Sequence, residues 1–376
     1  MKILNVTVLI DPVLGGGTAE RTVQMSQALS ENGVDCSILT TDVGLTEERV
    51  LSLRGVNLVV LRCILKRYFI FIFSVRKLRK LLSGVDIVHL MGHWSFLNVL
   101  IYLIARATKT PYVICPAGEL NIFGRSKIFK RVFNCLIGYR IVKDSAGYIA
   151  VTKDELPVYA KYGVSSAAVT VIPNGVHKLD DYEELNSEFN FPYILFMGRL
   201  NQIKGPDLLL EAFILIAKKN PQYHLIFAGP DGGSLNSLKE YISKLTIKNR
   251  VHFIGYVTGQ RKLKLYKNAE FLVIPSRHDA QSIVVLEAGI CGTPVLLTRT
   301  CGFDEAAKVG GGIVVEPNVL GLKKGLLRML KDENNLSEMG ANLKFFVQEN
   351  YAWESISLRY IRMYENILNA RKLGKN

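Results

Sequence analysis

The chain has 376 residues and a formal net charge of +14, and 49% of its residues are hydrophobic. This length exceeds one ordinary core and fits two domains of about 170 to 200 residues each. Charged residues make up 21% and are interspersed, without low-complexity stretches, so the composition excludes a disordered or fibrous protein.

Targeting and partner signals are few. The first apolar run leads into Asp11 and a Gly-rich turn without a cleavage-like site, so we expect a first strand and not a signal peptide. No apolar stretch has the roughly 20 residues that span a bilayer. The basic residues follow no nucleic-acid-binding motif. Six scattered cysteines without paired spacing favour reduced thiols in the cytoplasm: Cys36, Cys63, Cys115, Cys135, Cys291 and Cys301.

Strand-like and helix-like patterns alternate along nearly the whole chain. Apolar runs end near Ile10, Leu39, Leu61, Leu90, Cys115 and Val151, and later near Met197, Ala228, Gly255, Ile274 and Leu297. This alternation predicts two doubly wound α/β domains with parallel sheets. Pro and Asn-Gly between Val171 and Val176 predict a boundary, giving domains 1–172 and 173–352. A C-terminal helix over 353–376 marks a second crossing, and two crossings leave a cleft that can open and close.

A Gly-rich loop, Leu14 to Gly17, follows the first strand and precedes a helix from Thr18 to Leu29. Glycines such as Gly16 and Gly17 let the backbone approach a ligand closely. The loop lacks the Gly-x-Gly-x-x-Gly pattern, and Asp42 gives only partial support for a dinucleotide site. A purely structural tight turn is the alternative.

A basic amphipathic pattern follows the aromatic run 68–73. The apolar positions on one helical face are Phe71, Val75, Leu78 and Leu82. The basic residues on the other face are Arg76, Lys77, Arg79 and Lys80. Such a helix suits an anionic membrane surface. An ordinary sheet-covering helix with a solvated basic face explains the pattern equally well.

Ionisable residues follow two further strands of the first half. His89 and His93 end one strand; His93 comes after it and is better placed to reach a ligand, whereas His89 suits a packed strand position. Glu119 follows the next strand, so it belongs to the same edge of the sheet. A helix-entry carboxylate is the alternative for Glu119.

Two cations occupy a strand-to-helix loop in the second half. A strand from Tyr193 to Met197 ends at Gly198, and a helix runs from Pro206 to Ala217. Arg199 and Lys204 lie between them, where doubly wound sheets bind ligands. A fixed guanidinium and a mobile ammonium suit a diphosphate. A solvated basic loop is the alternative.

The segment from Pro275 to Val295 predicts an anion and diol site. A short strand, a polar loop with Asp279, and a helix entered through Ser282 follow one another. Unpaired N–H groups around Ser282 and Ile283 would point at a phosphate or sugar oxygen, and Glu287 could bind a ribose diol. The combination indicates a nucleotide-sugar pocket, although Asp279 can also be read as a simple loop carboxylate.

These residues resemble the retaining family-four glycosyltransferases of the GT-B fold. The matching residues of the second-half signature are Glu287, Ala288, Gly292, Pro294 and Val295. Asp279 stands where the family usually has Glu. His89, Gly92 and Trp94 match a His-x-His-Gly-x-Trp pattern in which Met91 replaces the second His.

The resemblance implies roles for several of these positions. Position 279 would contact the donor sugar, Glu287 the ribose, and Arg199 with Lys204 the diphosphate. The Gly-rich loop, with Arg21 as an extra cation, would face the diphosphate and the acceptor across the cleft. The C-terminal helix would pack back on the first domain.

No Asp-x-Asp triplet occurs, and no histidine or cysteine spacing fits a metal site. Preorganised cations and helix N-termini can neutralise a departing diphosphate without a metal. We therefore expect metal-independent transfer without a resident cofactor.

Together these observations predict a GT-B enzyme with two Rossmann-like domains, an N-terminal acceptor domain and a C-terminal donor domain. It would move a sugar, with retention, from a nucleoside diphosphate sugar to a lipid-linked or cell-envelope glycan, in the cytoplasm or on the inner face of the membrane. The expected catalytic residues are His93, Asp279, Arg199 and Lys204. The expected substrate-binding residues are Gly16, Gly17, Arg21, Glu119, Arg199, Lys204, Asp279, Gln281, Ser282, Ile283 and Glu287.

Three other functions remain open from the sequence. A same-fold epimerase or phosphorylase would need no acceptor alcohol. A nicotinamide-dependent dehydrogenase would need a convincing dinucleotide loop. A non-catalytic sugar-nucleotide-binding subunit would bind the donor and turn nothing over.

Overall fold

The computed structural model describes residues 1–122, 126–179, 186–331 and 333–373, and it divides into two compact units. Unit 1 comprises Met1–Gly175 and Trp353–Asn376, and unit 2 comprises Val176–Ala352.

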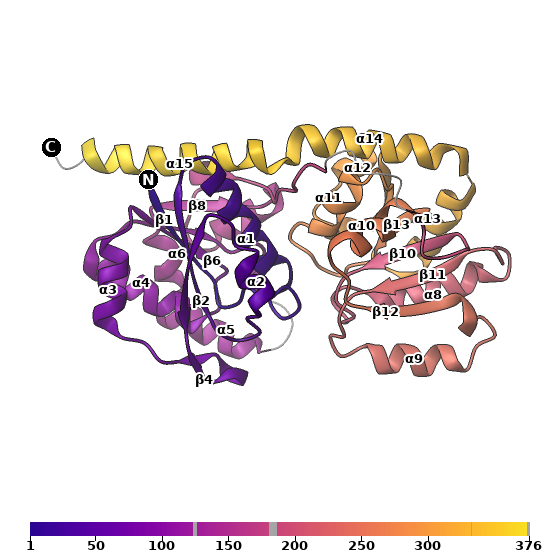
Figure 1. Cartoon of the computed structure of the whole chain (residues 1–376), viewed down its shortest axis with the longest axis horizontal. Coiled ribbons are helices and arrows are strands. Elements are labelled where there is room, and N and C mark those ends of the chain that lie inside the picture. Colours follow the sequence, from indigo (N-terminus) through magenta and orange to yellow (C-terminus); the bar gives the residue numbers. More distant parts are fainter. Residues whose placement is uncertain (123–125, 180–185, 332, 374–376) are drawn as a thin grey trace. The chain divides into compact units, whose positions relative to one another are not determined.

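A seven-stranded parallel sheet in the order β3-β2-β1-β6-β7-β8-β9 forms the centre of unit 1 (Figure 1). Its strands are β1 (Lys2–Val6), β2 (Asp35–Thr41), β3 (Val56–Leu61), β6 (Ile87–Met91), β7 (Tyr112–Cys115), β8 (Gly147–Ala150) and β9 (Val169–Val171). A separate antiparallel ribbon pairs β4 (Cys63–Leu65) with β5 (Ile70–Phe71). The helices are α1 (Gly16–Glu31), α2 (Glu47–Leu51), α3 (Val75–Ser83), α4 (Phe96–Thr108), α5 (Lys127–Phe133), α6 (Tyr139–Lys143), α7 (Leu156–Ala160) and α15 (Trp353–Leu373), with a π-helical turn η2 (Asn134–Gly138).

Two serine caps start the helices that cover one face of this sheet. The hydroxyls of Ser74 and Ser95 accept hydrogen bonds from backbone N–H groups in the first turns of α3 and α4, which satisfies otherwise unpaired donors. Leu78 and Leu82 of α3 are buried in the core cluster, and the basic residues of α3 are exposed. The helix therefore covers the sheet with a solvated basic face; its contact with a membrane stays a prediction.

The C-terminal helix α15 packs on unit 1 beside α1 (Figure 1). The Trp353 indole N–H donates to the side-chain oxygen of Gln24 at 2.8 Å. The Tyr364 hydroxyl lies 2.8 Å from Nδ1 of His89 on the central strand β6. These long-range polar contacts join the last helix of the chain to its first helix and to the sheet.

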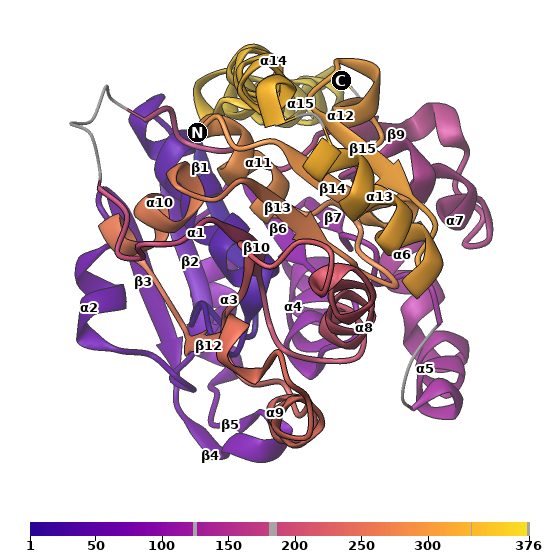
Figure 2. The ribbon, with the colours of Figure 1, turned by 90° about the vertical axis from the view of Figure 1, so that its right-hand side faces the viewer.

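Unit 2 contains a six-stranded parallel sheet in the order β12-β11-β10-β13-β14-β15 (Figure 2). Its strands are β10 (Tyr193–Met197), β11 (His224–Ala228), β12 (Val251–Gly255), β13 (Phe271–Ile274), β14 (Val295–Thr298) and β15 (Gly312–Val315). Its helices are α8 (Pro206–Ala217), α9 (Leu235–Ser243), α10 (Gly259–Lys267), α11 (Ile283–Ile290), α12 (Glu305–Lys308), α13 (Val319–Lys331) and α14 (Glu333–Tyr351).

Alternate residues of the unit 2 strands point into two separate cores. Ile194 and Phe196 pack with α8, α9 and α13 on one face, whereas Leu195 and Met197 pack with α10, α11, α12 and α14 on the other. Burial on both faces explains why these strands are continuous apolar runs and not alternating ones.

The expectation of two doubly wound parallel sheets is confirmed. The first strand is shorter than predicted: β1 ends at Val6 and not near Ile10. Beyond it the backbone stays hydrogen-bonded to β2, since the Val8 carbonyl accepts from both the N–H and the hydroxyl of Thr41. The short β4, β5 and β15 were not anticipated.

Candidate active site

The strand order of each sheet reverses at one position, between β1 and β6 in unit 1 and between β10 and β13 in unit 2. Loops at the carboxyl ends of strands flanking such a switch point form the ligand-binding crevices of open α/β sheets. The predicted residues lie largely in or directly after these four loops.

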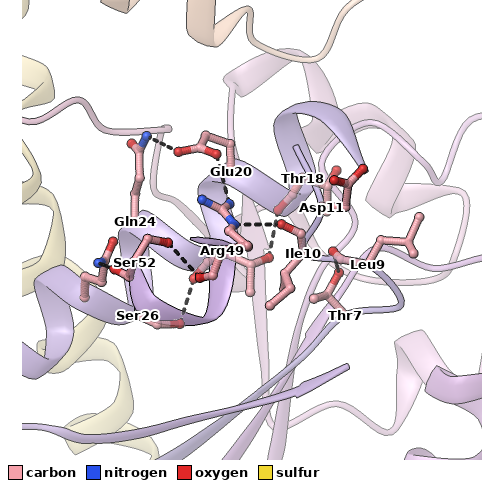
Figure 3. A network of polar contacts seen from close by, with 12 residues as sticks. Thr7, Leu9, Ile10, Asp11, Thr18, Glu20, Gln24, Ser26, Arg49 and Ser52 are labelled. Carbon is pink, nitrogen blue, oxygen red and sulfur yellow. Dashed lines mark hydrogen bonds and ion pairs between the residues drawn. The ribbon is translucent and has the colours of Figure 1, made fainter. Parts of the chain in front are cut away.

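The loop after β1 is held by a hydrogen bond within the loop and by one from Arg49 of α2. The Asp11 carboxylate accepts from Leu14 N at 2.6 Å. The Arg49 guanidinium, mostly buried, donates from Nε to the Ile10 carbonyl at 2.8 Å and pairs with Glu20 at 2.9 Å (Figure 3). Arg49 was not among the predicted residues, because a cation in a short helix gives no local sign of what it contacts.

The predicted Gly16 and Gly17 form the first turn of α1. Gly16 has φ +58°, a conformation that glycine adopts without strain. The neighbouring Gly15 and Thr18 line a cavity of about 320 Å³ at the switch point of unit 1.

His93 and Glu119 line the same cavity. A Glu119 oxygen accepts from the backbone N–H of His93 at 2.6 Å and of Trp94 at 3.4 Å. Gly92 lets the Glu119 carboxylate lie this close to the backbone. It has φ +81°, and a Cβ there would lie 2.9 Å from the Glu119 carboxylate. Burial raises the pKa of Glu119, and the two N–H bonds oppose that shift.

The imidazole of His93 is buried and neutral. Its Nε2 lies 3.1 Å from Oδ1 of Asn134, whose amide donates to Tyr162 at 2.7 Å. Asn134 Oδ1 is thus an acceptor, and the network assigns the ring proton to Nε2. Burial lowers the pKa of His93 to about 4. Nδ1 is left as an acceptor without a hydrogen-bond partner among the described residues.

Arg21 is placed differently from the prediction. It is only 2% exposed, and its guanidinium donates to Sγ of Cys115 at 2.7 Å and to the Tyr360 hydroxyl at 2.5 Å. The side chain joins α1 to β7 and α15 inside unit 1. Contact with a diphosphate would need an exposed guanidinium, which this position does not offer.

The two switch-point loops of unit 2 are tied together. Lys204 Nζ lies 2.5 Å from Oδ2 of Asp279. Arg277 forms two bonds with the Asp207 carboxylate, at 2.6 and 2.8 Å, and also donates to the Gln202 carbonyl at 2.7 Å. The structure therefore brings Lys204 and Asp279 into direct contact.

Arg199 directly follows Gly198 at the end of β10 and is partly exposed. Its aliphatic stem lies against Gly232 of the loop after β11. Arg199 therefore lies at the same edge of the sheet as Lys204 and Asp279.

Glu287, in the second turn of α11, is held by two residues of α10. One carboxylate oxygen accepts from Lys262 Nζ at 2.5 Å and the other from the Tyr266 hydroxyl at 2.8 Å. Burial raises the pKa of Tyr266, as does the neighbouring carboxylate, so the hydroxyl stays a donor. Lys262 and Tyr266 were not predicted, although their spacing of four places them on one helix face.

The start of α11 differs in part from the prediction. Ser282 occupies the N-cap position, but its side chain makes no capping bond. Its backbone N–H is not unpaired, because it donates to the Cys301 carbonyl at 3.3 Å. Ile283 is the first residue of the helix, and Gln281 is buried beside it.

Within the described ranges, no group of three His, Cys, Asp or Glu side chains is arranged to hold a metal ion. No described helix is long and apolar enough to cross a membrane.

Both halves of the chain match known protein families. Residues 15–178 match the family described as Glycosyltransferase Family 4, and residues 180–344 match Glycosyl transferases group 1. An uncharacterized glycosyltransferase of Methanocaldococcus jannaschii is 27% identical over 97% of this chain and 98% of its own length.

Solved structures share the fold at low sequence identity. HepE of Anabaena, crystallised with UDP and glucose, superposes with a TM-score of 0.79 at 17% identity, covering 97% of this chain and 100% of HepE. WaaG, a glycosyltransferase involved in lipopolysaccharide biosynthesis, superposes with a TM-score of 0.68 at 16% identity over 95% and 98% of the two chains. These likenesses confirm the GT-B fold.

Proposed function

This chain belongs to the group 1 and family 4 glycosyltransferases, and we propose that it moves a hexosyl group from a nucleoside diphosphate sugar to a lipid-linked or cell-envelope glycan, with retention. The observation that carries this proposal is the arrangement at the unit 2 switch point. There Lys204 pairs with Asp279 at 2.5 Å, and Glu287 is held by Lys262 and Tyr266.

Unit 2 would be the donor domain. Lys204 and Arg199 would neutralise the growing charge on the leaving diphosphate. Asp279, Gln281 and the backbone at Ser282 and Ile283 would orient the sugar. Glu287, fixed by two donors, would accept hydrogen bonds from the ribose hydroxyls, as carboxylates near nucleotide sites do.

Unit 1 would be the acceptor domain. His93 lines the cavity, and its ring would have to shift for the buried acceptor Nδ1 to receive a hydrogen bond from a sugar hydroxyl. Glu119 would fix the loop that carries His93, and Gly16 and Gly17 would let the α1 N-terminus approach the ligand.

The proposed reaction breaks the bond between the anomeric carbon and the diphosphate oxygen and forms a bond to the acceptor oxygen on the same face. The acceptor proton passes to the leaving phosphate. Since the cations stabilise the leaving group, no metal is required, and we expect the rate to be unchanged by EDTA. We place the enzyme in the cytoplasm, with peripheral contact to the inner face of the membrane.

The test is a thermal-shift series with UDP, GDP, ADP, CMP and NAD. A nucleotide at 100 times its Kd should stabilise its site by about 2.7 kcal/mol, or roughly 5 to 10 °C for a domain of this size. Glu287→Gln should lose most of the shift, and Glu240→Ala, which removes an exposed ion pair, should keep it. A shift with NAD alone would refute the donor site. A nucleotide shift without transfer to any glycan acceptor would indicate a binding subunit instead.

A further inference from the structure

The β4–β5 ribbon has one side facing the unit 1 cavity and another facing solvent. Tyr68, Phe69 and Phe71 line the cavity. Outside it, Ile64 and Ile72 are 64% and 57% exposed. A concentration of large apolar side chains on one exposed ribbon is unusual for a surface without a ligand or partner.

An aromatic cluster connects the cavity to this exposed side. The ring of Phe71, which is buried, lies 5.7 Å from that of Phe96 and 5.9 Å from that of Phe73. Phe96 is 55% exposed at the start of α4 and also lines the cavity. An apolar path therefore runs from the cavity wall to the outer ribbon.

The lining of the cavity is chemically mixed. Ten of its seventeen lining residues are apolar or aromatic, whereas His93 and Glu119 are its ionisable groups. Its volume of about 320 Å³ lies at the lower end for small-molecule sites, so it holds only part of a larger ligand. The rest must leave along a wall of the cavity.

Cations accompany the apolar path. Lys66 and Arg67 lie in the turn between β4 and β5, and the Arg67 guanidinium is 5.7 Å from the centre of the Tyr68 ring. Lys130 Nζ lies 5.3 Å from the centre of the Trp94 ring, which lines the cavity. Cations beside an apolar path complement a ligand with an anionic group next to a hydrocarbon chain.

We infer that the unit 1 cavity and the β4–β5 ribbon bind the hydrocarbon chain and anionic link of an amphiphilic acceptor, whose reacting end lies at His93 and Glu119. This inference rests on the proposed function and narrows it: the acceptor is lipid-linked, and a free glycan lacks the part that the ribbon binds. The chain lies along Phe71, Phe96 and the outer ribbon, where its burial supplies affinity that a free sugar cannot obtain.

Tryptophan fluorescence tests the inference, because Trp94 lines the cavity. The probes are hexyl, octyl and dodecyl phosphate below their critical micelle concentrations, with glycerol phosphate as the chain-free analogue. We expect a saturable signal that is lost in Trp94→Phe, and an affinity that rises by up to about fourfold for each methylene removed from water. Phe96→Ser and Ile72→Ser should each weaken dodecyl phosphate binding about fivefold or more. Leu215→Ser, on an equally exposed residue of α8, should leave binding unchanged.

Three results would overturn the inference: equal binding of glycerol phosphate, full affinity in both Phe96→Ser and Ile72→Ser, or binding to anionic phosphatidylglycerol vesicles but to no monomeric alkyl phosphate. The last result would identify the ribbon as a membrane-docking surface. Thermal shifts with nucleoside diphosphates on the same preparations report unit 2 separately. A lost nucleotide shift with retained chain binding would refute the proposed function and leave the chain site standing.

Discussion

Gly205 offers a sharp test of how the two switch-point loops of unit 2 are held together. It precedes α8 with φ +68° and ψ 31°, and a Cβ at this position would lie 2.1 Å from the Pro275 carbonyl oxygen. The loop after β10 can approach the loop after β13 this closely only without a side chain. Gly205→Ala must therefore shift the backbone of one loop and so disturb the Lys204–Asp279 pair.

The magnitude follows from two contributions. A left-handed conformation costs a residue with a Cβ roughly 1 to 2 kcal/mol. The clash with Pro275 adds a further cost, so we expect Gly205→Ala to lower the free energy of unfolding by about 3 kcal/mol or more. Gly255→Ala is the matched control: it has φ +75° in the same unit, with no atom within 4 Å of the added Cβ. It should lose only about 1 to 2 kcal/mol.

The assay is urea unfolding followed by circular dichroism, with hydrogen exchange of peptides covering 198–210 and 272–284. Gly205→Ala should accelerate exchange in both peptides and weaken nucleoside diphosphate binding, whereas Gly255→Ala should do neither. Equal losses of stability in the two variants, within about 0.5 kcal/mol, would show that the loops relax without cost and would refute the reasoning.

Three further predictions concern two buried polar groups and the cation Lys204. Burial lowers the pKa of His93 to about 4, so between pH 6.5 and 4 the unfolded state binds the extra proton and stability falls with falling pH, by up to about 3 kcal/mol. His93→Gln should remove this part of the pH dependence of the free energy of unfolding and leave the part due to the other buried histidine, His89, and an unchanged slope would contradict the assignment. Tyr360→Phe, which removes an acceptor from the buried Arg21, should cost about 1 to 3 kcal/mol in urea unfolding. Tyr241→Phe, at an exposed residue of α9, should change the free energy of unfolding by no more than about 0.5 kcal/mol. Equal effects of the two variants would show that Tyr360 does not anchor Arg21. Lys204→Ala should lower kcat for transfer about 10² to 10³-fold, and wild-type kcat would exclude Lys204 from leaving-group stabilisation.

Local sequence patterns were sufficient to locate the loops that carry both candidate sites. Apolar runs followed by Gly-rich or charged segments placed Gly16, His93, Glu119, Lys204 and Asp279 just after strands. In a parallel sheet such segments all emerge at one edge, so the pattern of elements also limits where ligands bind. The same alternation predicted two doubly wound domains, and the family resemblance carried by the residues around Glu287 implied the GT-B fold.

The tertiary structure alone decided which partner each polar side chain meets. Arg21 was predicted as an extra cation for the diphosphate, but α15, more than three hundred residues later in the chain, covers it and supplies Tyr360. Lys262 became a partner of Glu287 because α10 and α11 pack on the same face of the unit 2 sheet. Sequence periodicity reports the face of an element that is buried, and it carries no information on the distant element that covers that face. Burial, charge pairing and the shape of the cavity are therefore set by the packing of elements that are far apart in the chain.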